Sequence, residues 1–471
     1  MADAVMTIDG RSVAGTSEFD VLNPAEGTPM GVAPQCSAEQ LDSAMLAADR
    51  ALGTWSSDHE VRQKALHHAA DLLRSAAPEL GAILTKEQGG PLPMSVGQLI
   101  GSSSWLDYYA DLTQPHSEVL HHPGRTFEIT HRPVGVVAAI TPWNAPILLA
   151  MWKIAPALAA GATMVLKPSP HTPLTTLALG QLFAEALPPG VFNVVSGQEP
   201  LGKQLVEHRT PRKIALTGSI GTGKAVAAAA AADLKRVTLE LGGNDAAILL
   251  DGVDIDVLIE PLFWSAFINA GQICEATKRV YVPRRLYPQL LEALSERARS
   301  IRVGDGFDPN VQMGPLTTDF QRDHVDALVR EAKAQGATIA AGGHRLPGNG
   351  YFFEPTIIGD VQDGARIVDD EQFGPALPVI AYDDIDETVR RINDSPYGLG
   401  ASVWSHDVEA ARSVADRLDS GHVKVNAAHL PPPSDVPFGG VKWSGIGIEN
   451  GVEGLREYTE IRVMEIGEIP V

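Results

Sequence analysis

The chain has little cysteine and no excess of basic residues. Its 471 residues include two cysteines, Cys36 and Cys274, and 58 acidic against 37 basic residues, for a formal net charge of −21. Nucleic acids and anionic membranes attract clustered Lys and Arg, so this balance argues against either as the main partner. A reducing cytosol disfavours a disulfide between the two cysteines, and Cys36 is expected to be structural or inert.

Long apolar runs, targeting patterns and metal-ligand clusters are also missing. The N-terminal ten residues have neither a basic start nor a long apolar stretch, which predicts no secretory signal and a cytoplasmic protein. The most membrane-like segment, 146–166, is interrupted by Lys153, Pro156 and Gly161, and favours a core helix followed by a buried strand. The two adjacent histidine pairs have no further ligand at zinc-like spacing, so no metal site is predicted.

The hydrophobic pattern indicates an α/β protein. A chain of this length exceeds the size at which one core keeps growing, so two or three packed units are expected. Residues 39–87 have helical periodicity, and from residue 134 short apolar runs alternate with helical stretches. Parallel strands need a crossover of about a dozen residues, so the alternation predicts parallel sheets covered by helices. The first series has expected strands at 134–140, 162–166, 191–195, 214–216 and 237–239, with helices at about 147–160, 172–186, 201–208 and 221–232.

A second series begins after Asn244. Its expected strands are 246–250, 280–282, 357–358, 379–381 and 423–426, and its helices lie at about 284–299, 319–335 and 407–418. The predicted fold class is therefore α/β with two parallel-sheet, Rossmann-like domains, in which ligands bind beyond the carboxyl ends of the strands. The strand-like segments 119–133 and 455–471 fit neither series.

Cys274 is the first candidate for chemistry. It ends the loop Phe267-Ile-Asn-Ala-Gly-Gln-Ile-Cys274, 34 residues after Glu240 of Glu240-Leu-Gly-Gly-Asn244. A lone thiol in such a loop, with a separate carboxylate in a Gly-Gly turn, indicates a nucleophile and a general base. An unpaired cysteine is more often a small buried hydrophobe, so the thiol alone does not establish catalysis.

Seven motifs in a fixed order carry more information than any one of them. They are Thr141-Pro-Trp-Asn144, Lys167-Pro-Ser169, Thr217-Gly-Ser-Ile-Gly-Thr-Gly223, Glu240-Leu-Gly-Gly-Asn244, Gly271-Gln-Ile-Cys274, Glu371-Gln-Phe-Gly-Pro375 and Pro437-Phe-Gly-Gly440. Their order and spacing resemble the NAD(P)-dependent aldehyde dehydrogenase superfamily over essentially the whole chain. The resemblance implies that 1–118 with 134–243 form the NAD(P)-binding domain and 244–442 the catalytic domain. It further implies that 119–133 and 455–471 form a small β element through which the chain makes a homodimer or homotetramer.

The resemblance and the chemistry of aldehyde oxidation together assign the catalytic candidates. A hydride leaves a carbon that bears an oxyanion more readily than it leaves a hydrated aldehyde, so the Cys274 thiolate first adds to the aldehyde. The resemblance implies that the Asn144 side-chain amide and the Cys274 backbone N–H donate hydrogen bonds to this oxyanion. Loss of one such donor typically lowers the rate by about 10² to 10³. Glu240 then activates the water that releases a carboxylic acid from the thioester. Lys153 and Glu449 resemble a proton-relay pair, or they simply pair their charges in the core.

The predicted cofactor site departs from the usual dinucleotide fingerprint. Gly218-Ser-Ile-Gly-Thr-Gly223 offers no Gly-x-Gly-x-x-Gly, but it lies where a strand leads into a helix, so backbone N–H groups and the helix dipole can face a pyrophosphate. The Lys167–Ser169 triplet resembles the family's grip on the adenosine ribose, and Glu371 with Phe373 its clamp on the nicotinamide ribose. Pro170 stands where a Glu would repel the 2′-phosphate of NADP, so that carboxylate is absent here. NAD is the expected cofactor, and NADP is the alternative. The cofactor candidates are Ile140, Thr141, Pro142, Trp143, Lys167, Ser169, Gly218, Ser219, Gly223, Leu241, Glu371 and Phe373.

Two unusual residues flank the catalytic candidates. Ala145 stands where many relatives place a bulky aromatic, which predicts a wider pocket. Glu275 follows Cys274 where small or hydroxyl residues are more familiar; it favours a substrate with a cationic or hydroxyl group, or it pairs with Lys278 without a role in binding. A largely apolar lining that suits a medium-sized aliphatic or aromatic aldehyde is completed by Leu149, Trp152, Ile273, His429 and Leu430.

Two other functions compete with a non-acylating aldehyde dehydrogenase. One is a CoA-acylating relative, such as a semialdehyde dehydrogenase, although Glu240 is superfluous when a thiol rather than water accepts the acyl group. The other is a non-catalytic binding protein on the same fold, against which Cys274, Glu240 and Asn144 together argue.

Overall fold

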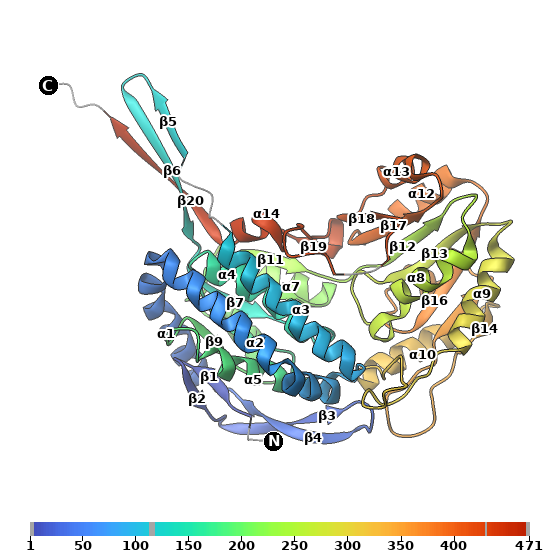
Figure 1. The fold of residues 1–471 in the computed structure, drawn as a ribbon, viewed down its shortest axis with the longest axis horizontal. Helices are drawn as coiled ribbons and strands as arrows, with labels where there is room; N and C mark the ends of the chain where they lie inside the picture. The colour runs from blue at the N-terminus through green and yellow to red at the C-terminus, as the bar shows by residue number, and fades with distance from the viewer. Residues whose placement is uncertain (1–3, 113–117, 429–430, 468–471) are drawn as a thin grey trace.

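The chain folds into two sheet-centred units and a projecting three-stranded sheet (Figure 1). The computed structural model describes residues 4–112, 118–428 and 431–467. Within those ranges no helix is long and apolar enough to cross a membrane.

The first unit is built on an eight-stranded sheet with the order β19-β11-β10-β7-β8-β9-β1-β2. The central five strands, from β11 to β9, are parallel, as the alternating pattern predicts, but both edges are antiparallel. The strands are β1 (Met6–Ile8), β2 (Arg11–Val13), β7 (Val136–Ile140), β8 (Thr163–Lys167), β9 (Phe192–Val194), β10 (Lys213–Thr217), β11 (Arg236–Glu240) and β19 (Gly445–Ile446). The helices are α1 (Ala38–Ser57), α2 (His59–Gln88), α3 (Leu92–Asp111), α4 (Pro146–Ala159), α5 (Leu174–Phe183), α6 (Leu201–Glu207), α7 (Ile220–Ala231) and α14 (Gly451–Arg456).

The second unit holds a seven-stranded sheet with the order β14-β15-β16-β13-β12-β17-β18, parallel except for the edge strand β14. The strands are β12 (Asp245–Leu249), β13 (Thr277–Pro283), β14 (Thr338–Ala341), β15 (Thr356–Gly359), β16 (Ala376–Tyr382), β17 (Gly400–Trp404) and β18 (His422–Val425). The helices are α8 (Ile255–Phe267), α9 (Tyr287–Arg299), α10 (Asp319–Ala334), α11 (Arg366–Asp369), α12 (Ile385–Asn393) and α13 (Val408–Ala415), with the 3-10 turns η1 (Ile268–Gly271) and η2 (Lys442–Ser444). The apolar runs therefore predict five of the strands, but not β14 or β17.

The four N-terminal strands, β1 to β4, were not expected from the sequence. The hairpin β3 (Ser17–Asn23) and β4 (Thr28–Gln35) runs along the edge of the molecule from the first unit towards the second (Figure 1). At its tip the Tyr351 N–H donates to the Pro24 carbonyl over 2.8 Å, so the hairpin fastens the two units together.

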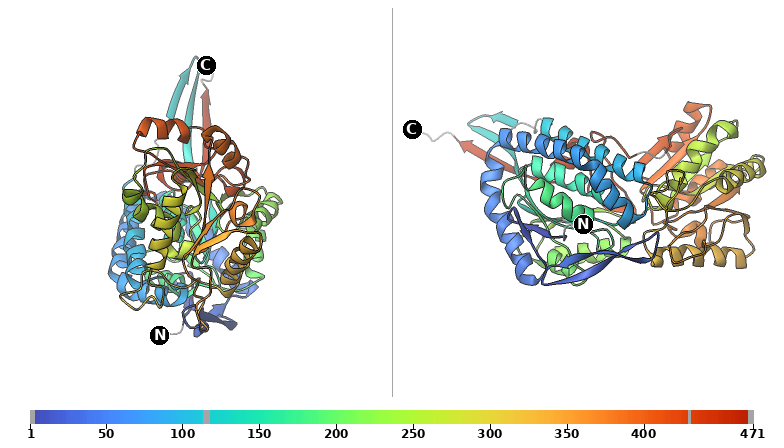
Figure 2. Two further views of the ribbon diagram at one scale, coloured as in Figure 1. Left: turned by 90° about the vertical axis from the view of Figure 1, so that its right-hand side faces the viewer. Right: turned by 60° about the horizontal axis from the view of Figure 1, so that its bottom comes forward.

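The segments that fit neither series form one small sheet. It consists of β5 (Glu118–His122), β6 (Arg125–Pro133) and β20 (Thr459–Gly467), and β20 pairs with β6 from Thr459 opposite Pro133 to Gly467 opposite Arg125. Figure 2 shows that this sheet projects from the body in both further views.

Strand register decides which residues of the first sheet meet. In the parallel pairs Ile140 lies opposite Lys167 and Leu216, and Thr217 lies opposite Glu240. Parallel strands that end in register place their following loops along one edge, which is where α/β sheets bind ligands.

Candidate active site

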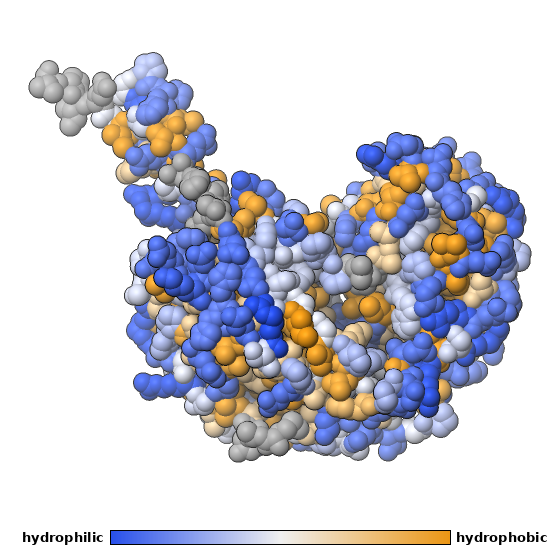
Figure 3. All heavy atoms as spheres, in the orientation of Figure 1, coloured by the Kyte–Doolittle hydropathy of each residue, from blue (hydrophilic) through white to orange (hydrophobic). Residues whose placement is uncertain are grey.

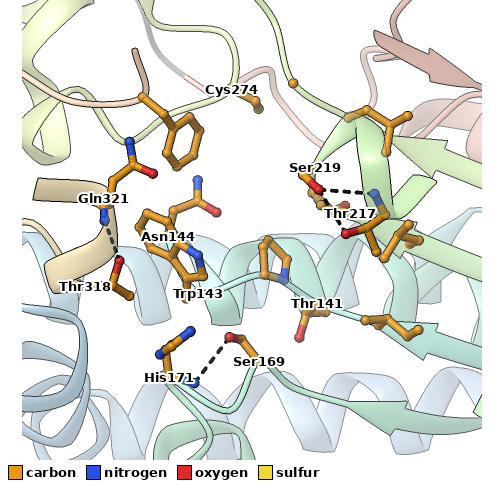
Figure 4. Close-up of a pocket in the computed structure, with 18 of the residues that line it drawn as sticks. Thr141, Trp143, Asn144, Ser169, His171, Thr217, Ser219, Cys274, Thr318 and Gln321 are labelled. Carbon is orange, nitrogen blue, oxygen red and sulfur yellow. Dashed lines mark hydrogen bonds between the residues drawn. The ribbon is translucent and has the colours of Figure 1, made fainter. Parts of the chain in front are cut away.

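A cavity of about 590 Å³ lies at this carboxyl edge, between the two units (Figure 4). In this view Cys274 lies at one end and Ser169 with His171 at the other, with Asn144 and Trp143 between them. The lining residues are Ile140, Thr141, Pro142, Trp143, Asn144, Lys167, Ser169, Pro170, His171, Leu216, Thr217, Gly218, Ser219, Thr222, Glu240, Leu241, Gly242, Cys274, Thr318, Phe320, Gln321, His324, Glu371 and Phe373.

A strained turn presents Cys274 to the cavity. After α8 the chain enters η1, where Asn269 and Ala270 have φ angles of 52° and 54° and Gly271 has 74°. Non-glycine residues rarely adopt this left-handed conformation, and such strain persists only where the surroundings hold it. Gln272 supplies that restraint, since its Nε2 donates to the Asn269 carbonyl over 2.9 Å and its Oε1 accepts from the Thr317 N–H over 2.9 Å.

Asn144 is tied to the same turn. Its Nδ2 donates to the Gln272 carbonyl over 2.9 Å, and its own carbonyl accepts from Asn269 Nδ2 over 3.0 Å. Gln88, at the end of α2, donates to Asn269 Oδ1 over 2.6 Å. The structure places Asn144 and Cys274 on the same cavity. Gln272 belongs to the Gly271–Cys274 motif, but the motif does not indicate that it fixes their geometry, and Gln88 and Asn269 lie outside the seven motifs.

Glu240 faces the cavity from the end of β11 and is 1% exposed. Neither carboxylate oxygen has a hydrogen-bond partner within the described part of the chain. Burial raises the pKa of Glu240 well above its ordinary value, although the charge of Lys153 and a contact with the Cys274 thiol oppose the shift. Burial, with the carboxylates of Glu240 and Glu275, likewise raises the pKa of the Cys274 thiol. The thiol must therefore give its proton to a base before it can act, and Glu240 is a carboxylate that shares its cavity.

Lys153 and Glu449 form a buried ion pair behind the cavity. Lys153 Nζ lies 2.8 Å from Glu449 Oε1 and donates to Thr217 Oγ1 over 2.7 Å, and the two side chains are 0% and 2% exposed. Neither residue lines the cavity, but Thr217 does. The pair is thus separated from the cavity wall by a single hydroxyl group.

All the cofactor candidates except Gly223 line the cavity. Ser219 caps α7 by accepting from the Thr222 N–H over 3.2 Å, so the helix N-terminus opens onto the cavity. A Cβ on Gly223 would lie 2.5 Å from the Leu241 side chain, so this glycine allows α7 to pack closely on Leu241. Its contact with a cofactor stays a prediction.

The nicotinamide-side candidates lie on the second unit. The Gly243 N–H donates to Glu371 Oε1 over 3.1 Å, and a Cβ on Gly242 would collide with that carboxylate. Burial raises the pKa of Glu371 to about 7, against the opposing charge of Lys278. Phe373 stands edge-on to Trp143, with ring centroids 5.4 Å apart. A glycine is therefore required for Glu371 to reach the cavity.

The adenosine-side candidates lie on the first unit. Lys167 is 6% exposed, and its Nζ donates to the Pro168 carbonyl over 3.1 Å. Burial lowers the pKa of Lys167 to about 8, although the charge of Glu199 opposes the shift. His171 lines the same end of the cavity and was missed by the sequence motifs. The motifs also missed the helix cap Thr318 and three residues of α10 that line the cavity, Phe320, Gln321 and His324.

The substrate candidates that the structure describes lie outside this cavity. Ala145, Leu149 and Trp152 are buried, and in the described ranges none of them, nor Ile273 or Glu275, lines it. Trp152 packs between Trp105 and Phe438, with ring centroids 6.2 Å and 5.1 Å away. His429 and Leu430 lie outside the described residues. The aldehyde-binding role of these residues remains a prediction.

Glu275 turns towards strand β18. Its Oε2 accepts from Lys424 Nζ over 2.8 Å and lies 3.3 Å from His422 Nδ1, while Lys278 donates to the Ile273 carbonyl. The sequence suggested Lys278 as the partner because it is the nearest lysine along the chain. Strand β18, far away in sequence, supplies a lysine and a histidine to this carboxylate. Burial lowers the pKa of Lys278, and the charge of Glu275 is one of those that oppose this shift.

Comparisons of the sequence and of the structure with known proteins all find aldehyde dehydrogenases. A family model described as the aldehyde dehydrogenase family matches residues 12–464. A betaine aldehyde dehydrogenase of Brucella anthropi is 39% identical over 95% of this chain and 94% of its own length. A probable succinate-semialdehyde dehydrogenase [NADP(+)] of Sinorhizobium fredii is 36% identical over 97% of this chain and 94% of its own. The NAD+ complex of an aldehyde dehydrogenase from Bacillus cereus has a TM-score of 0.96 at 36% identity and covers 99% of this chain and 96% of its own.

Proposed function

The chain belongs to the aldehyde dehydrogenase family, and we propose that it oxidises an aldehyde to a carboxylic acid through a Cys274 thiohemiacetal and thioester, with NAD+ as the hydride acceptor. The observation that carries the proposal is one cavity onto which Cys274, Glu240 and Asn144 open together with Lys167 and Glu371. The chemistry needs a nucleophile, a carboxylate and an amide donor close together, and Cys274, Glu240 and Asn144 supply them. Lys167 and Glu371 are the predicted cofactor-binding groups on the same cavity.

The residues present fit a dinucleotide. The cavity volume lies in the range of about 300 to 1,000 Å³ typical of cofactor sites. The capped N-terminus of α7 would hold the pyrophosphate, Lys167 and Ser169 the adenosine ribose, and Glu371 the nicotinamide ribose. Bound NAD+ supplies the acceptor for a hydride.

Each catalytic residue has a task that its surroundings support. Cys274 forms the bond to the aldehyde carbon, and its proton passes to a base. Asn144 Nδ2 carries two N–H groups, and one of them already donates to Gln272, which orients the amide. Glu240 takes a proton from the water that cleaves the thioester. Lys153 and Glu449 support proton transfer from behind Thr217.

Preference for NAD over NADP belongs to the same proposal. Pro170 brings no carboxylate to the ribose end, but Glu199 lies close enough to Lys167 to affect its pKa. A carboxylate near a 2′-phosphate repels it. The Bacillus cereus relative was solved with NAD+, whereas the Sinorhizobium fredii relative carries NADP(+) in its name. Comparison of NADH and NADPH formation at equal cofactor concentration tests the preference.

For the substrate we propose a medium-sized aliphatic or aromatic aldehyde that reaches Cys274 past Ala145, Trp152 and Phe438. The aromatic group of Trp105, Trp152 and Phe438 supports an apolar entrance. The ion pair of Glu275 with Lys424 lowers the attraction of that carboxylate for a cationic aldehyde. Betaine aldehyde and succinate semialdehyde, named for relatives, belong in the test panel beside benzaldehyde and propanal.

The decisive experiment is this aldehyde panel scored by NADH and NADPH absorbance, with Cys274→Ala as the matched control. We expect turnover with at least one aldehyde, free acid as the product, and no turnover in the variant. Acyl-CoA as the product when CoA is added would support the acylating alternative. Absence of any NADH formation with all aldehydes would favour a non-catalytic protein.

We also propose that the domain division predicted from the sequence, with 1–118 and 134–243 for NAD(P) binding and 244–442 for catalysis, corresponds to the two units. Segments 119–133 and 455–471 would then pair the chain with other copies. The projecting sheet supports this, because Ile461, Val463 and Ile466 are exposed on β20 and apolar side chains gather on the sheet (Figure 3). Exposed apolar edge strands are normally covered. Light scattering should give two or four times the chain mass of 50.1 kDa.

A further inference from the structure

A row of polar residues crosses the otherwise apolar interior of the first sheet. Lys213 and Thr217 lie at alternate positions of β10, and Thr238 and Glu240 lie at alternate positions of β11. Thr238 is opposite Ala215 and Glu240 is opposite Thr217, so all four side chains share one face. Lys213 is 0% exposed and Glu240 is 1% exposed. Buried parallel strands are usually continuous apolar runs, so this row needs a reason.

The far end of the row reaches the surface. Lys213 Nζ donates to Thr238 Oγ1 over 2.6 Å and to Glu457 Oε2 over 3.1 Å, and the Thr238 hydroxyl donates to the same carboxylate oxygen over 3.1 Å. The Glu457 side chain is 29% exposed, whereas that of Lys213 is fully buried. Glu457 therefore connects a buried ammonium group to solvent.

The Lys153–Glu449 pair joins the row at Thr217, and the Glu449 carboxylate is close enough to Lys213 to act on its pKa. Lys213 Nζ lies 5.1 Å from the centre of the Tyr458 ring, and Tyr458 is 1% exposed. Glu449 Oε2, the Tyr458 hydroxyl and both Glu240 oxygens have no hydrogen-bond partner among the described residues. Buried polar atoms in native proteins are nearly always hydrogen-bonded, most often to ordered water when no protein group is near.

We propose that Lys213 and Glu457 form the solvent end of a proton route that begins at Glu240 and passes Thr217, Lys153, Glu449 and Tyr458. The inference rests on the proposed function, which generates a proton at Glu240 in every turnover. When water attacks the thioester, its oxygen bonds to the acyl carbon, the carbon–sulfur bond breaks with its electrons on Cys274, and one water proton passes to Glu240. That proton must reach solvent before Glu240 can act again.

The charges along the row favour transfer in small steps. Burial raises the pKa of Glu449, with Lys153 and Lys213 opposing the shift, and burial lowers the pKa of Lys213, with Glu457 and Glu449 opposing it. An acid and a base whose pKa values approach each other exchange a proton at a smaller free-energy cost than the ordinary carboxyl and ammonium groups. The other charged group near Lys213 is Arg236, which also lowers its pKa.

The same contacts have a purely structural interpretation. The Lys213–Glu457 pair could serve only to fasten the C-terminal segment onto the sheet, as the Arg236 contact with the Thr459 carbonyl over 2.8 Å also does. A structural role and a proton route differ in one property. Only a lost proton route can be replaced by a small buffer molecule that enters the cavity.

The test uses Lys213→Met in the full-length protein, with Lys235→Met as the matched control. Lys235 has a side chain that is 2% exposed and donates to the Val206 and His208 carbonyls, away from the row. With an aldehyde accepted by the wild type, the NADH burst and the steady-state rate are measured in dilute and in concentrated imidazole buffer.

We expect Lys213→Met to keep the NADH burst, to lose about tenfold in steady-state rate in dilute buffer, and to regain most of that rate in concentrated imidazole. Lys235→Met should show no such buffer dependence. Glu457→Gln should give a smaller loss with the same recovery. An unchanged rate, or a loss that imidazole does not reverse, would overturn the proposal. Failure of the wild type to form NADH with any aldehyde would instead refute the proposed function.

Discussion

Replacement of Lys153 by Met should destabilise the protein by an amount that depends on pH. The variant leaves Glu449, which is 2% exposed, without the ammonium group that lies 2.8 Å away. Removing one partner of a buried ion pair costs about 3 to 5 kcal/mol, whereas exposed pairs contribute about 0 to 1 kcal/mol. The loss should therefore clearly exceed that of an exposed control, Arg284→Met, whose pair with Asp383 has side chains that are 65% and 68% exposed.

Protonation of Glu449 limits the loss of folding stability that Lys153→Met causes. The ordinary pKa of a Glu carboxyl group is 4.5, and one pKa unit is worth about 1.4 kcal/mol, so holding Glu449 neutral near pH 7 costs about 3.5 kcal/mol. Without Lys153 the folded-state pKa of Glu449 rises further above its unfolded value. A raised folded pKa adds stability below the unfolded value and loses it as pH rises, so the cost of the substitution should fall to about 1.4 kcal/mol near pH 5.5.

Urea unfolding followed by tryptophan fluorescence, at pH 5.5 and pH 7, measures both quantities. Lys153→Met should unfold at lower urea than the wild type, and the gap should narrow at the lower pH. The double variant Lys153→Met with Glu449→Gln should recover most of the loss, because no buried charge is left unpaired. A loss that is the same at both pH values, or that the double variant does not recover, would refute this account of the pair.

Three further predictions concern other parts of the molecule. Glu240→Gln should keep the NADH burst but slow turnover by about 10² to 10⁴, because only thioester hydrolysis needs the base; slow turnover without a burst in stopped-flow absorbance would remove Glu240 from this role. His67 lies 2.9 Å from both Asp107 and Asp111, and although burial opposes protonation, these carboxylates raise its pKa. The stability that His67 adds should be complete below its unfolded pKa of about 6.5 and be lost as pH rises through the folded value, so the urea midpoints of wild type and His67→Asn should converge at alkaline pH. Ala145→Phe should raise KM for benzaldehyde far more than for propanal, since one methylene group in such a pocket is worth about 1 to 3 kcal/mol; equal effects on both would exclude Ala145 from the aldehyde path.

The sequence predicts the chemistry-bearing strand ends of the first unit well. Ile140, Lys167, Thr217 and Glu240 end apolar runs that the structure confirms as parallel strands. Such runs are recognisable because a strand buried on both faces has no polar alternation and must be followed by a loop. The order of motifs at these ends also indicates the family, which the comparisons confirm.

The hydrophobic pattern of the sequence does not predict strands that are short or lack an apolar run. Strand β17, the antiparallel strands β1, β2 and β19 of the first sheet and the edge strand β14 were not predicted, because short strands take their stability from neighbours that are distant in sequence. Glu275 illustrates the same limit for side chains. Lys278 is its nearest lysine along the chain, but the contacts with Lys424 and His422 come from β18, which no spacing along the chain indicates.

The sequence by itself determined the α/β class, the family, and the identities of a thiol, a carboxylate and an amide suited to aldehyde oxidation, because each is encoded in a short motif. Only the tertiary structure decided that Gln88 and Gln272 hold the strained turn before Cys274, and that Lys213, Glu449 and Glu457 line up behind Glu240. These groups come from a helix end, two strands and the C-terminal segment. Burial, charge pairing and proton transfer depend on distances in space, which no motif spacing along the chain specifies.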